Sequence, residues 1–140
     1  MVDRIPKDGR AERGLIDIGL RYARAIDNRD FALVLTCFTE DAIWFGRTGH
    51  REIEAAMRAF LSRYGTTQHI TTNFEPVVLE RTGTMRSLYM ATHCQLGTGA
   101  PFVIGGRYQD RFVSTPGGWR IMERVVHVDW ETGLRAEHHG

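Results

Sequence analysis

The feature that most constrains the fold is a change of hydrophobic period at Gly65. Before this glycine, apolar residues recur every three to four positions, which is the period of an amphipathic helix. After it, apolar and polar residues alternate in long runs, which is typical of half-buried strands. Because helices come first and strands follow, the pattern predicts an α+β fold with helices on one face of a curved antiparallel sheet.

The first half of the chain is expected to form helices over residues 11–27 and 50–64, with a shorter helix between them. The apolar face of the first helix carries Leu15, Ile18, Tyr22 and Ile26. Asp30 is placed to cap the shorter helix, because aspartate accepts hydrogen bonds from the free N–H groups at a helix start. Residues 39–41 are expected to form a turn and residues 42–45 a short strand.

The second half is expected to form strands separated by glycine-containing turns. Their expected ranges are 68–73, 76–81, 84–96, 102–114 and 119–130. A sheet of this kind curves into a cone whose mouth lies beside the first helix, around an internal apolar pocket. The length suits one domain over residues 1–140, with residues 1–10 and 134–140 as mobile tails.

Alternation along the long strands indicates which side chains face the helices. In the strand over residues 102–114, Tyr108 and Asp110 share the inward face with apolar residues, and a carboxylate is unusual there. In the last strand, the predicted inward face combines Arg124 with Met122, Val126 and Val128. A buried guanidinium needs a partner, for which Asp110 and Glu123 are candidates.

The charge balance argues against several classes of partner. The formal net charge is +1, so nothing favours nucleic acid or an anionic membrane as a partner. There is no apolar run long enough for a membrane span and no apolar leader, so a soluble cytoplasmic protein is expected. The only lysine is Lys7 in the expected N-terminal tail, which rules against Schiff-base chemistry by an internal lysine.

Known cofactor and metal motifs are missing from the sequence. There is no complete dinucleotide-binding glycine motif and no phosphate-binding loop, so no cofactor is expected. His69, His93 and His127 fall on three different expected strands without the close spacing of metal ligands, so no metal site is expected. A serine nucleophile elbow is also missing.

His69 is the strongest candidate for chemistry. It lies in the segment 67–73, where one face of the sheet should meet a cavity lined by helices, and imidazole suits proton transfer near neutral pH. Taken alone, His69 can equally be a histidine that satisfies its hydrogen bonds within a sheet. Asp27 taken alone can be a polar residue at a helix end, and Arg124 can be a structural ion-pair partner.

Several blocks, taken in order, resemble the SnoaL-like group within the nuclear transport factor 2-like cone fold over residues 14–133. The blocks are residues 22–27, 29–31, 38–42, 67–69, 105–110 and 117–121. Their sequences are YARAID, RDF, FTEDA, TQH, GGRYQD and GGWRI. The resemblance extends to members of the scytalone dehydratase and hexachlorocyclohexane dehydrochlorinase types.

The resemblance implies an Asp27–His69 dyad inside an apolar pocket. It matches Arg124 to an arginine of the dehydrochlorinase type, and it places Trp44 and His93 near polar positions of the dehydratase type. The chain departs from both types. Tyr22 stands where dehydrochlorinases carry a lysine, and Ile26 and Trp44 stand where the dehydratase carries tyrosines.

The function implied is that of a cofactor-independent lyase or isomerase, of dehydratase, cyclase or dehydrohalogenase type. Its substrate would be a small apolar cyclic or aromatic molecule. His69 would be the base, Asp27 would orient it and Arg124 would act electrostatically. The residues expected to bind substrate are Tyr22, Trp44, His93, Tyr108 and Asp110.

Two alternatives stay open at this stage. The chain can be a non-catalytic member of the fold, either a binder of small ligands or a partner resembling the β-subunit of ring-hydroxylating dioxygenases. It can also resemble ketosteroid isomerase, with Asp110 as the base in place of His69. A homo-oligomer, dimer or trimer, is expected because the outer face of the sheet carries Leu88, Val103 and Val113.

Overall fold

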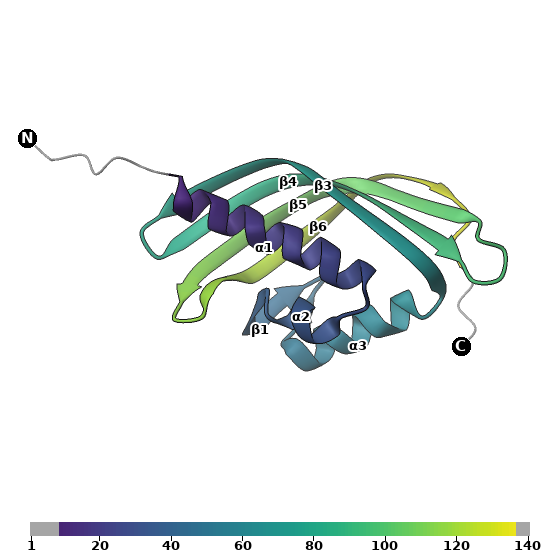
Figure 1. The fold of residues 1–140 in the computed structure, drawn as a ribbon, viewed down its shortest axis with the longest axis horizontal. Helices are drawn as coiled ribbons and strands as arrows, with labels where there is room; N and C mark the ends of the chain where they lie inside the picture. The colour runs from purple at the N-terminus through teal and green to yellow at the C-terminus, as the bar shows by residue number, and fades with distance from the viewer. Residues whose placement is uncertain (1–8, 137–140) are drawn as a thin grey trace, which may run out of the picture.

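The computed structural model describes residues 9–136, which form three helices and one six-stranded sheet (Figure 1). The helices are α1 (Arg10–Asp27), α2 (Phe31–Leu35) and α3 (His50–Leu61). The strands are β1 (Phe38–Trp44), β2 (Arg47–Thr48), β3 (Tyr64–Leu79), β4 (Thr82–Gln95), β5 (Pro101–Thr115) and β6 (Gly118–Gly133). Figure 1 shows α1 lying along the sheet, with α2 and α3 gathered beside its C-terminal half. The α+β prediction is confirmed.

The sheet is mixed: the predicted antiparallel meander is confirmed, and the pairing of β1 with β6 is the one parallel addition among the described strands. The strand order is β2-β1-β6-β5-β4-β3, in which β3 to β6 form an antiparallel meander. β1 pairs in parallel with β6, and Trp44 lies opposite Arg124. The last strand of the meander, β6, has one free edge, and β1 pairs with that edge.

Two local predictions also need correction. Residues 39–41, expected as a turn, belong to β1. The two strands expected over residues 68–73 and 76–81 form the single strand β3, which has an irregularity between Thr72 and Glu75. Asn73 has a φ of 55°, a left-handed conformation that asparagine adopts more readily than most residues. The polar residues Thr72, Asn73 and Glu75 flank this irregularity, which is why the sequence suggested two strands where there is one.

The helices form for the reasons that the sequence suggests. The predicted apolar face of α1 is buried, with Leu15 and Ala25 wholly shielded from solvent. Asp30 caps α2, because its carboxylate accepts a hydrogen bond from the Leu33 backbone N–H at 3.1 Å. Gly14 lets the helix approach the sheet closely, since a Cβ at this position would lie 2.7 Å from the Trp119 ring.

The inward faces of β5 and β6 carry the buried polar residues. Tyr108 and Asp110 are buried as the alternation predicts. In β6 an irregularity opposite Arg111 and Phe112 shifts the register, so that Ile121 is buried at 0% exposure where Met122 was predicted to face inward. Arg124 lies beyond the irregularity and is buried.

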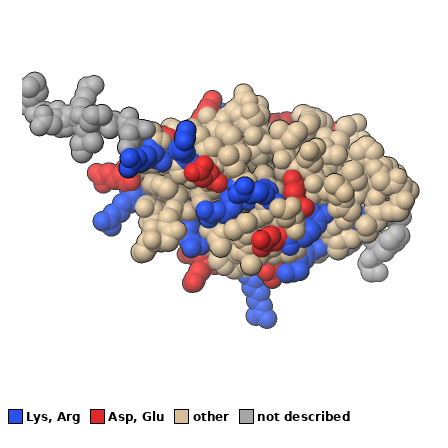
Figure 2. All heavy atoms as spheres, in the orientation of Figure 1, with Lys and Arg blue, Asp and Glu red and all other residues tan. Residues whose placement is uncertain are grey.

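The surface carries charges of both signs. Figure 2 shows basic and acidic side chains interspersed on this face of the molecule. On the predicted outer face of the sheet, Leu88 is exposed and Val103 and Val113 are partly buried, and self-association through this face stays a prediction.

Within residues 9–136, none of the helices combines the length and apolar character that crossing a bilayer requires. Lys7, most of the N-terminal tail and residues 137–140 lie outside the described residues.

Candidate functional site

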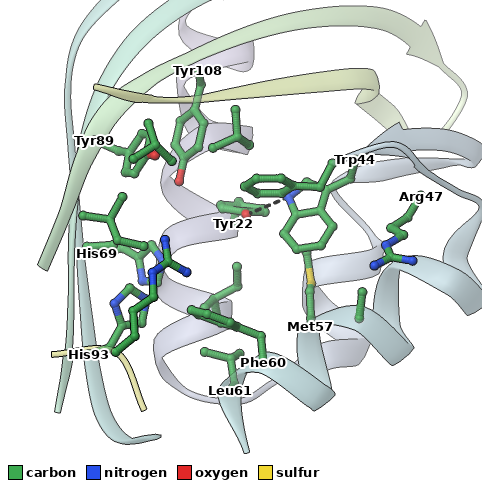
Figure 3. Close-up of a pocket in the computed structure, with 18 residues that line it drawn as sticks. Tyr22, Trp44, Arg47, Met57, Phe60, Leu61, His69, Tyr89, His93 and Tyr108 are labelled. Carbon is green, nitrogen blue, oxygen red and sulfur yellow. Dashed lines mark hydrogen bonds between the residues drawn. The ribbon is translucent and has the colours of Figure 1, made fainter. Parts of the chain in front are cut away.

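A cavity of about 370 Å³ opens between the sheet and the helices α1 and α3 (Figure 3). This volume falls within the range of small-molecule sites. Most of its lining is apolar, and the aliphatic and thioether side chains come from α1, α3 and the long strands. The polar or aromatic-polar lining residues are Tyr22, Trp44, Arg47, His69, Tyr89, His93, Tyr108 and Arg135.

Asp27 and His69 meet at the edge of this cavity. Asp27 is the last residue of α1, and its Oδ1 lies 2.7 Å from Nδ1 of His69 on β3. The backbone N–H of His69 donates to the other oxygen, Oδ2, at 2.8 Å. Because a carboxylate only accepts hydrogen bonds, Nδ1 carries the hydrogen, and in a neutral ring Nε2 keeps a free lone pair. His69 itself lines the cavity.

Thr67 binds the Asp27 carboxylate and Arg29 binds Thr67, and neither residue was predicted to belong to the site. The Thr67 hydroxyl donates to Oδ1 of Asp27 at 3.0 Å. Arg29 donates to the Thr67 hydroxyl at 2.8 Å and to the Gly65 carbonyl at 2.6 Å. Two features of the sequence could have pointed to these residues. The helical pattern breaks around Arg29, and Thr67 is two positions from His69, which places Thr67 and His69 on one face of a strand.

The Asp27 carboxylate stays ionised at neutral pH. Burial raises its pKa, but the hydrogen bonds from the His69 ring and backbone, the charge of His69 and the hydrogen bond from Thr67 oppose this effect. The net result is an Asp27 pKa below its ordinary value of 3.8. The carboxylate can therefore stabilise a protonated His69 ring.

Arg124 and Asp110 form a second pair, outside the cavity lining. Arg124 Nε donates to Oδ1 of Asp110 at 2.8 Å and Nη2 donates to Oδ2 at 2.9 Å, and both side chains are 0% exposed. The guanidinium carbon lies 4.3 Å from the ring centre of Tyr22 and 3.9 Å from that of Tyr108. The structure thus brings Asp27 to His69, whereas Arg124 and Asp110 lie behind the two tyrosines that line the cavity.

Tyr22 and Trp44 form a polar contact within the cavity wall. Trp44 Nε1 donates to the Tyr22 hydroxyl oxygen at 3.0 Å, as Figure 3 shows. Burial raises the pKa of Tyr22, although the Arg124 charge and the hydrogen bond from Trp44 oppose this effect. Tyr22 is therefore a neutral phenol at pH 7, and its own hydrogen is available to a ligand.

The other two cavity tyrosines stack on each other, with Tyr89 and Tyr108 ring centres 4.4 Å apart. The Tyr89 hydroxyl donates to the backbone carbonyl of His127 at 3.0 Å. Burial raises the pKa of Tyr89 to about 12 and that of Tyr108 well above its ordinary value. Both phenols are neutral at physiological pH.

His93 presents a hydrogen-bond acceptor to the cavity. Its Nδ1 lies 3.2 Å from the Phe102 carbonyl and must be the donor, which leaves Nε2 without a hydrogen in the neutral ring. Burial lowers the pKa of His93 to about 4, so the ring is neutral at pH 7. Its ring centre lies 5.8 Å from that of His69.

The three strand histidines do not converge. His127 lies away from the cavity lining, and its Nε2 is 3.2 Å from the Gln109 side chain. Within the part of the chain that the structure describes, no three His, Cys, Asp or Glu side chains are grouped to hold a metal ion.

Two arginines at the cavity were absent from the predicted site. Arg47 belongs to the two-residue strand β2, which is too short to give a sequence pattern. Arg135 belongs to a segment that was expected to be a tail, and it pairs with Glu131 at 2.7 Å. The next residue, Ala136, donates its backbone N–H to the Tyr64 hydroxyl at 3.1 Å.

The family described as SnoaL-like domain matches residues 10–125 of the chain. No curated protein matches the sequence.

Solved structures share the fold. A candidate scytalone dehydratase from Novosphingobium aromaticivorans is 21% identical, with a TM-score of 0.81 over 91% of this chain and 87% of that one. A hexachlorocyclohexane dehydrochlorinase from Novosphingobium barchaimii is 15% identical, with a TM-score of 0.78 over 92% and 93%. A Nostoc punctiforme protein of unknown function with a cystatin-like fold is 18% identical, with a TM-score of 0.72 over 84% and 90%. At these identities the likeness shows the fold alone.

Proposed function

The chain belongs to the SnoaL-like domain family, and we propose that it is a cofactor-independent lyase that uses His69 to remove a proton from carbon. One observation carries the proposal: the imidazole of His69 lines an apolar cavity while its Nδ1 is held by Asp27 at 2.7 Å. The neighbours of dehydratase and dehydrochlorinase type support a lyase at the level of fold.

Proton abstraction requires a base with a fixed lone pair. Nε2 of His69 takes the proton from a ring carbon next to a carbonyl group, and the electron pair of the C–H bond moves into the enolate. The ring then carries a positive charge, which the ionised Asp27 stabilises. General-base catalysis of this kind contributes about 10²–10⁴ in rate.

The enolate oxygen needs a hydrogen-bond donor, and Tyr22 supplies one. Its oxygen already accepts from Trp44, and the Arg124 guanidinium lies against its ring, so the phenol hydrogen is polarised and free. A donor aimed at a developing oxyanion in a dry site contributes about 10²–10³ in rate. Arg124 acts through Tyr22 and Tyr108, and we treat it as a positioning residue.

The elimination is completed when the bond to the leaving group breaks. For a β-hydroxyl substrate, the enolate electrons form the new double bond, and the departing hydroxide takes the proton from the His69 imidazolium to give water. For a halide, the anion leaves without that proton, and the His69 imidazolium releases it to water. Neither route needs a cofactor, because the same imidazole accepts a proton and releases it.

The arrangement favours His69 over Asp110 as the base. Both oxygens of Asp110 accept hydrogen bonds from Arg124, and the carboxylate lies outside the cavity lining. A carboxylate enclosed in this way has no lone pair directed at a ligand. The pH dependence of turnover separates these two assignments.

Binding without turnover is a second candidate function, which the predominantly apolar lining of the cavity favours. Such a binder requires the shape of the cavity and does not require the Asp27–His69 hydrogen bond. It predicts that a ligand is recovered unaltered, with no exchange of its hydrogens.

Hydrogen exchange in D₂O tests the proposal without knowledge of the true leaving group. Cyclic ketones with a β-hydroxyl or β-chloro substituent are incubated with the protein, and NMR follows both exchange of the α-hydrogen and elimination. We expect His69→Gln to abolish both reactions while ligand binding persists. His127→Gln, which alters a histidine outside the cavity lining, is the matched control and should react as wild type does. Equal exchange by wild type and His69→Gln would contradict the proposal.

A further inference from the structure

The charge of the cavity lining is one-sided. Among the described residues that line the cavity, none is aspartate or glutamate, and two are arginines, Arg47 and Arg135. The lining tyrosines are neutral because burial raises their pKa values, and His93 is neutral because burial lowers its pKa to about 4. The permanent charge at the cavity is therefore positive.

The nearby carboxylates do not offset this charge within the cavity. Asp27 is held by the ring and backbone of His69, and Asp110 is held by Arg124. Neither carboxylate lines the cavity. An anionic ligand would thus meet no exposed negative charge on its walls.

The two arginines differ in their partners. Arg135 donates to Glu131 at 2.7 Å, so its charge is already balanced. The backbone of Arg47 pairs with β1, but its guanidinium has no hydrogen bond or ion pair to any residue between 9 and 136. Glu52, in the first turn of α3, accepts a hydrogen bond from the Thr48 backbone N–H at 2.9 Å. Arg47 is the cavity cation that lacks a counter-charge.

The placement of Arg47 relative to His69 also favours an anionic ligand. Figure 3 shows His69 and Arg47 on opposite sides of the cavity, with Tyr22 and Trp44 between them. A cyclic molecule that presents a C–H bond to His69 therefore directs its far substituent toward Arg47. The rings and aliphatic groups between these two ends suit an apolar ring.

We propose that the substrate is an anion, a cyclic or aromatic molecule whose carboxylate binds Arg47 while its ring occupies the cavity. The inference rests on the function proposed above in taking the cavity of His69 as the substrate site. Guanidinium is planar and matches the two oxygens of a carboxylate, which favours this anion. Arg47 is exposed, so solvent weakens the pair, and we expect a contribution of about twofold to fivefold in affinity.

Matched pairs of neutral and anionic ligands test the inference. The probes are 1- and 2-naphthoate and the corresponding naphthamides, with binding followed by calorimetry. We expect wild type to bind each carboxylate more tightly than its amide. Arg47→Gln should remove this preference, and added salt should reduce it in wild type. Arg51→Gln, an exposed arginine of α3 outside the cavity lining, should keep the preference.

Three results would overturn the inference. They are equal binding of carboxylate and amide by wild type, a preference that survives in Arg47→Gln, and failure of both probe types to bind at millimolar concentration. Loss of the preference in Arg135→Gln alone would assign the anion to that residue instead. The same probes are measured with His69→Gln, which should retain the preference. Failure of the lyase proposal, read from hydrogen exchange, is therefore distinguishable from failure of the anion site.

Discussion

Asp27 and Asp110 each hold a nitrogen base or cation, and they differ in what surrounds them. Asp27 and His69 lie at the cavity edge, with side chains 22% and 9% exposed, and the His69 ring reaches the cavity. Asp110 and Arg124 are enclosed at 0% exposure, and neither lines the cavity. A histidine that reaches the cavity can take part in proton transfer. A permanently charged arginine enclosed behind the cavity lining can only support the side chains that form that lining.

The largest effect should come from breaking the enclosed pair. Asp110→Ala leaves Arg124 buried without its anionic partner, and removing one member of a buried pair costs about 3–5 kcal/mol. We expect urea denaturation to show a loss of that size. The double variant Asp110→Leu with Arg124→Met should recover much of the stability, because apolar residues need no partner. A single variant within about 1 kcal/mol of wild type would show that the pair is not structural.

Asp27→Asn should affect activity more than stability. An amide can donate to Nδ1, which favours the tautomer with hydrogen on Nε2 and removes the lone pair from the cavity. We expect turnover to fall about 10²–10⁴-fold, the range of general-base catalysis, with only a modest change in the urea midpoint. Measurement of kcat beside the unfolding curve separates the two effects. Large instability with unchanged specific activity would make this pair structural too.

A third effect follows from the buried ring of His93. Its folded-state pKa of about 4 is below its ordinary value of 6.5, because burial disfavours the charged ring. The unfolded chain then binds the proton more readily than the folded one. The stability that this group contributes is fully present above about pH 6.5 and is lost as pH falls toward 4.

Unfolding curves between pH 7 and pH 4 check this expectation. His93→Phe removes the titrating group. The free energy of unfolding of this variant should therefore fall less steeply between pH 7 and pH 4 than that of the wild-type protein. Parallel pH profiles for wild type and His93→Phe would contradict the expected linkage. His127→Gln serves as the control, because His127 is not in the cavity lining.

The smallest effect should come from removing the hydrogen bonds of Thr67, which hold Asp27 of the Asp27–His69 pair. Thr67→Val keeps the shape of the side chain and removes its hydrogen bonds to Asp27 and Arg29. A neutral hydrogen bond contributes about 1 kcal/mol, so turnover should fall by roughly fivefold to tenfold. Rescue in Thr67→Ser, which restores the hydroxyl, would support a positioning role. Equal losses in the valine and serine variants would contradict that role.

The sequence predicted the fold where hydrophobic period was long and regular. The helical face of α1 and the alternation in β5 placed Tyr22 and Asp110 on inward faces, and both are buried. The parallel pairing of β1 with β6 could not be predicted in this way, because period reports local structure and not the partner of a strand. Residues 68–73 and 76–81 were predicted as two strands, whereas β3 runs through both, with Asn73 in a left-handed conformation at its irregularity.

The site was predictable in part for a related reason. Alternation indicates the face on which Arg124 lies, but not whether another side chain stands between it and the cavity, and Tyr22 and Tyr108 do so. Arg47 lies on a strand of two residues, which gives no periodic signal. Its contribution to the cavity depends on tertiary structure alone.

The most direct measurement of the central claim is the position of the hydrogen on the His69 ring. Long-range ¹H–¹⁵N NMR of the labelled protein distinguishes the two tautomers of neutral imidazole. We expect hydrogen on Nδ1, facing Asp27, and a free lone pair on Nε2 in the cavity, with the tautomer changed in Asp27→Asn. Hydrogen on Nε2 in the wild-type protein would contradict the account, because the nitrogen open to the substrate could not then act as a base.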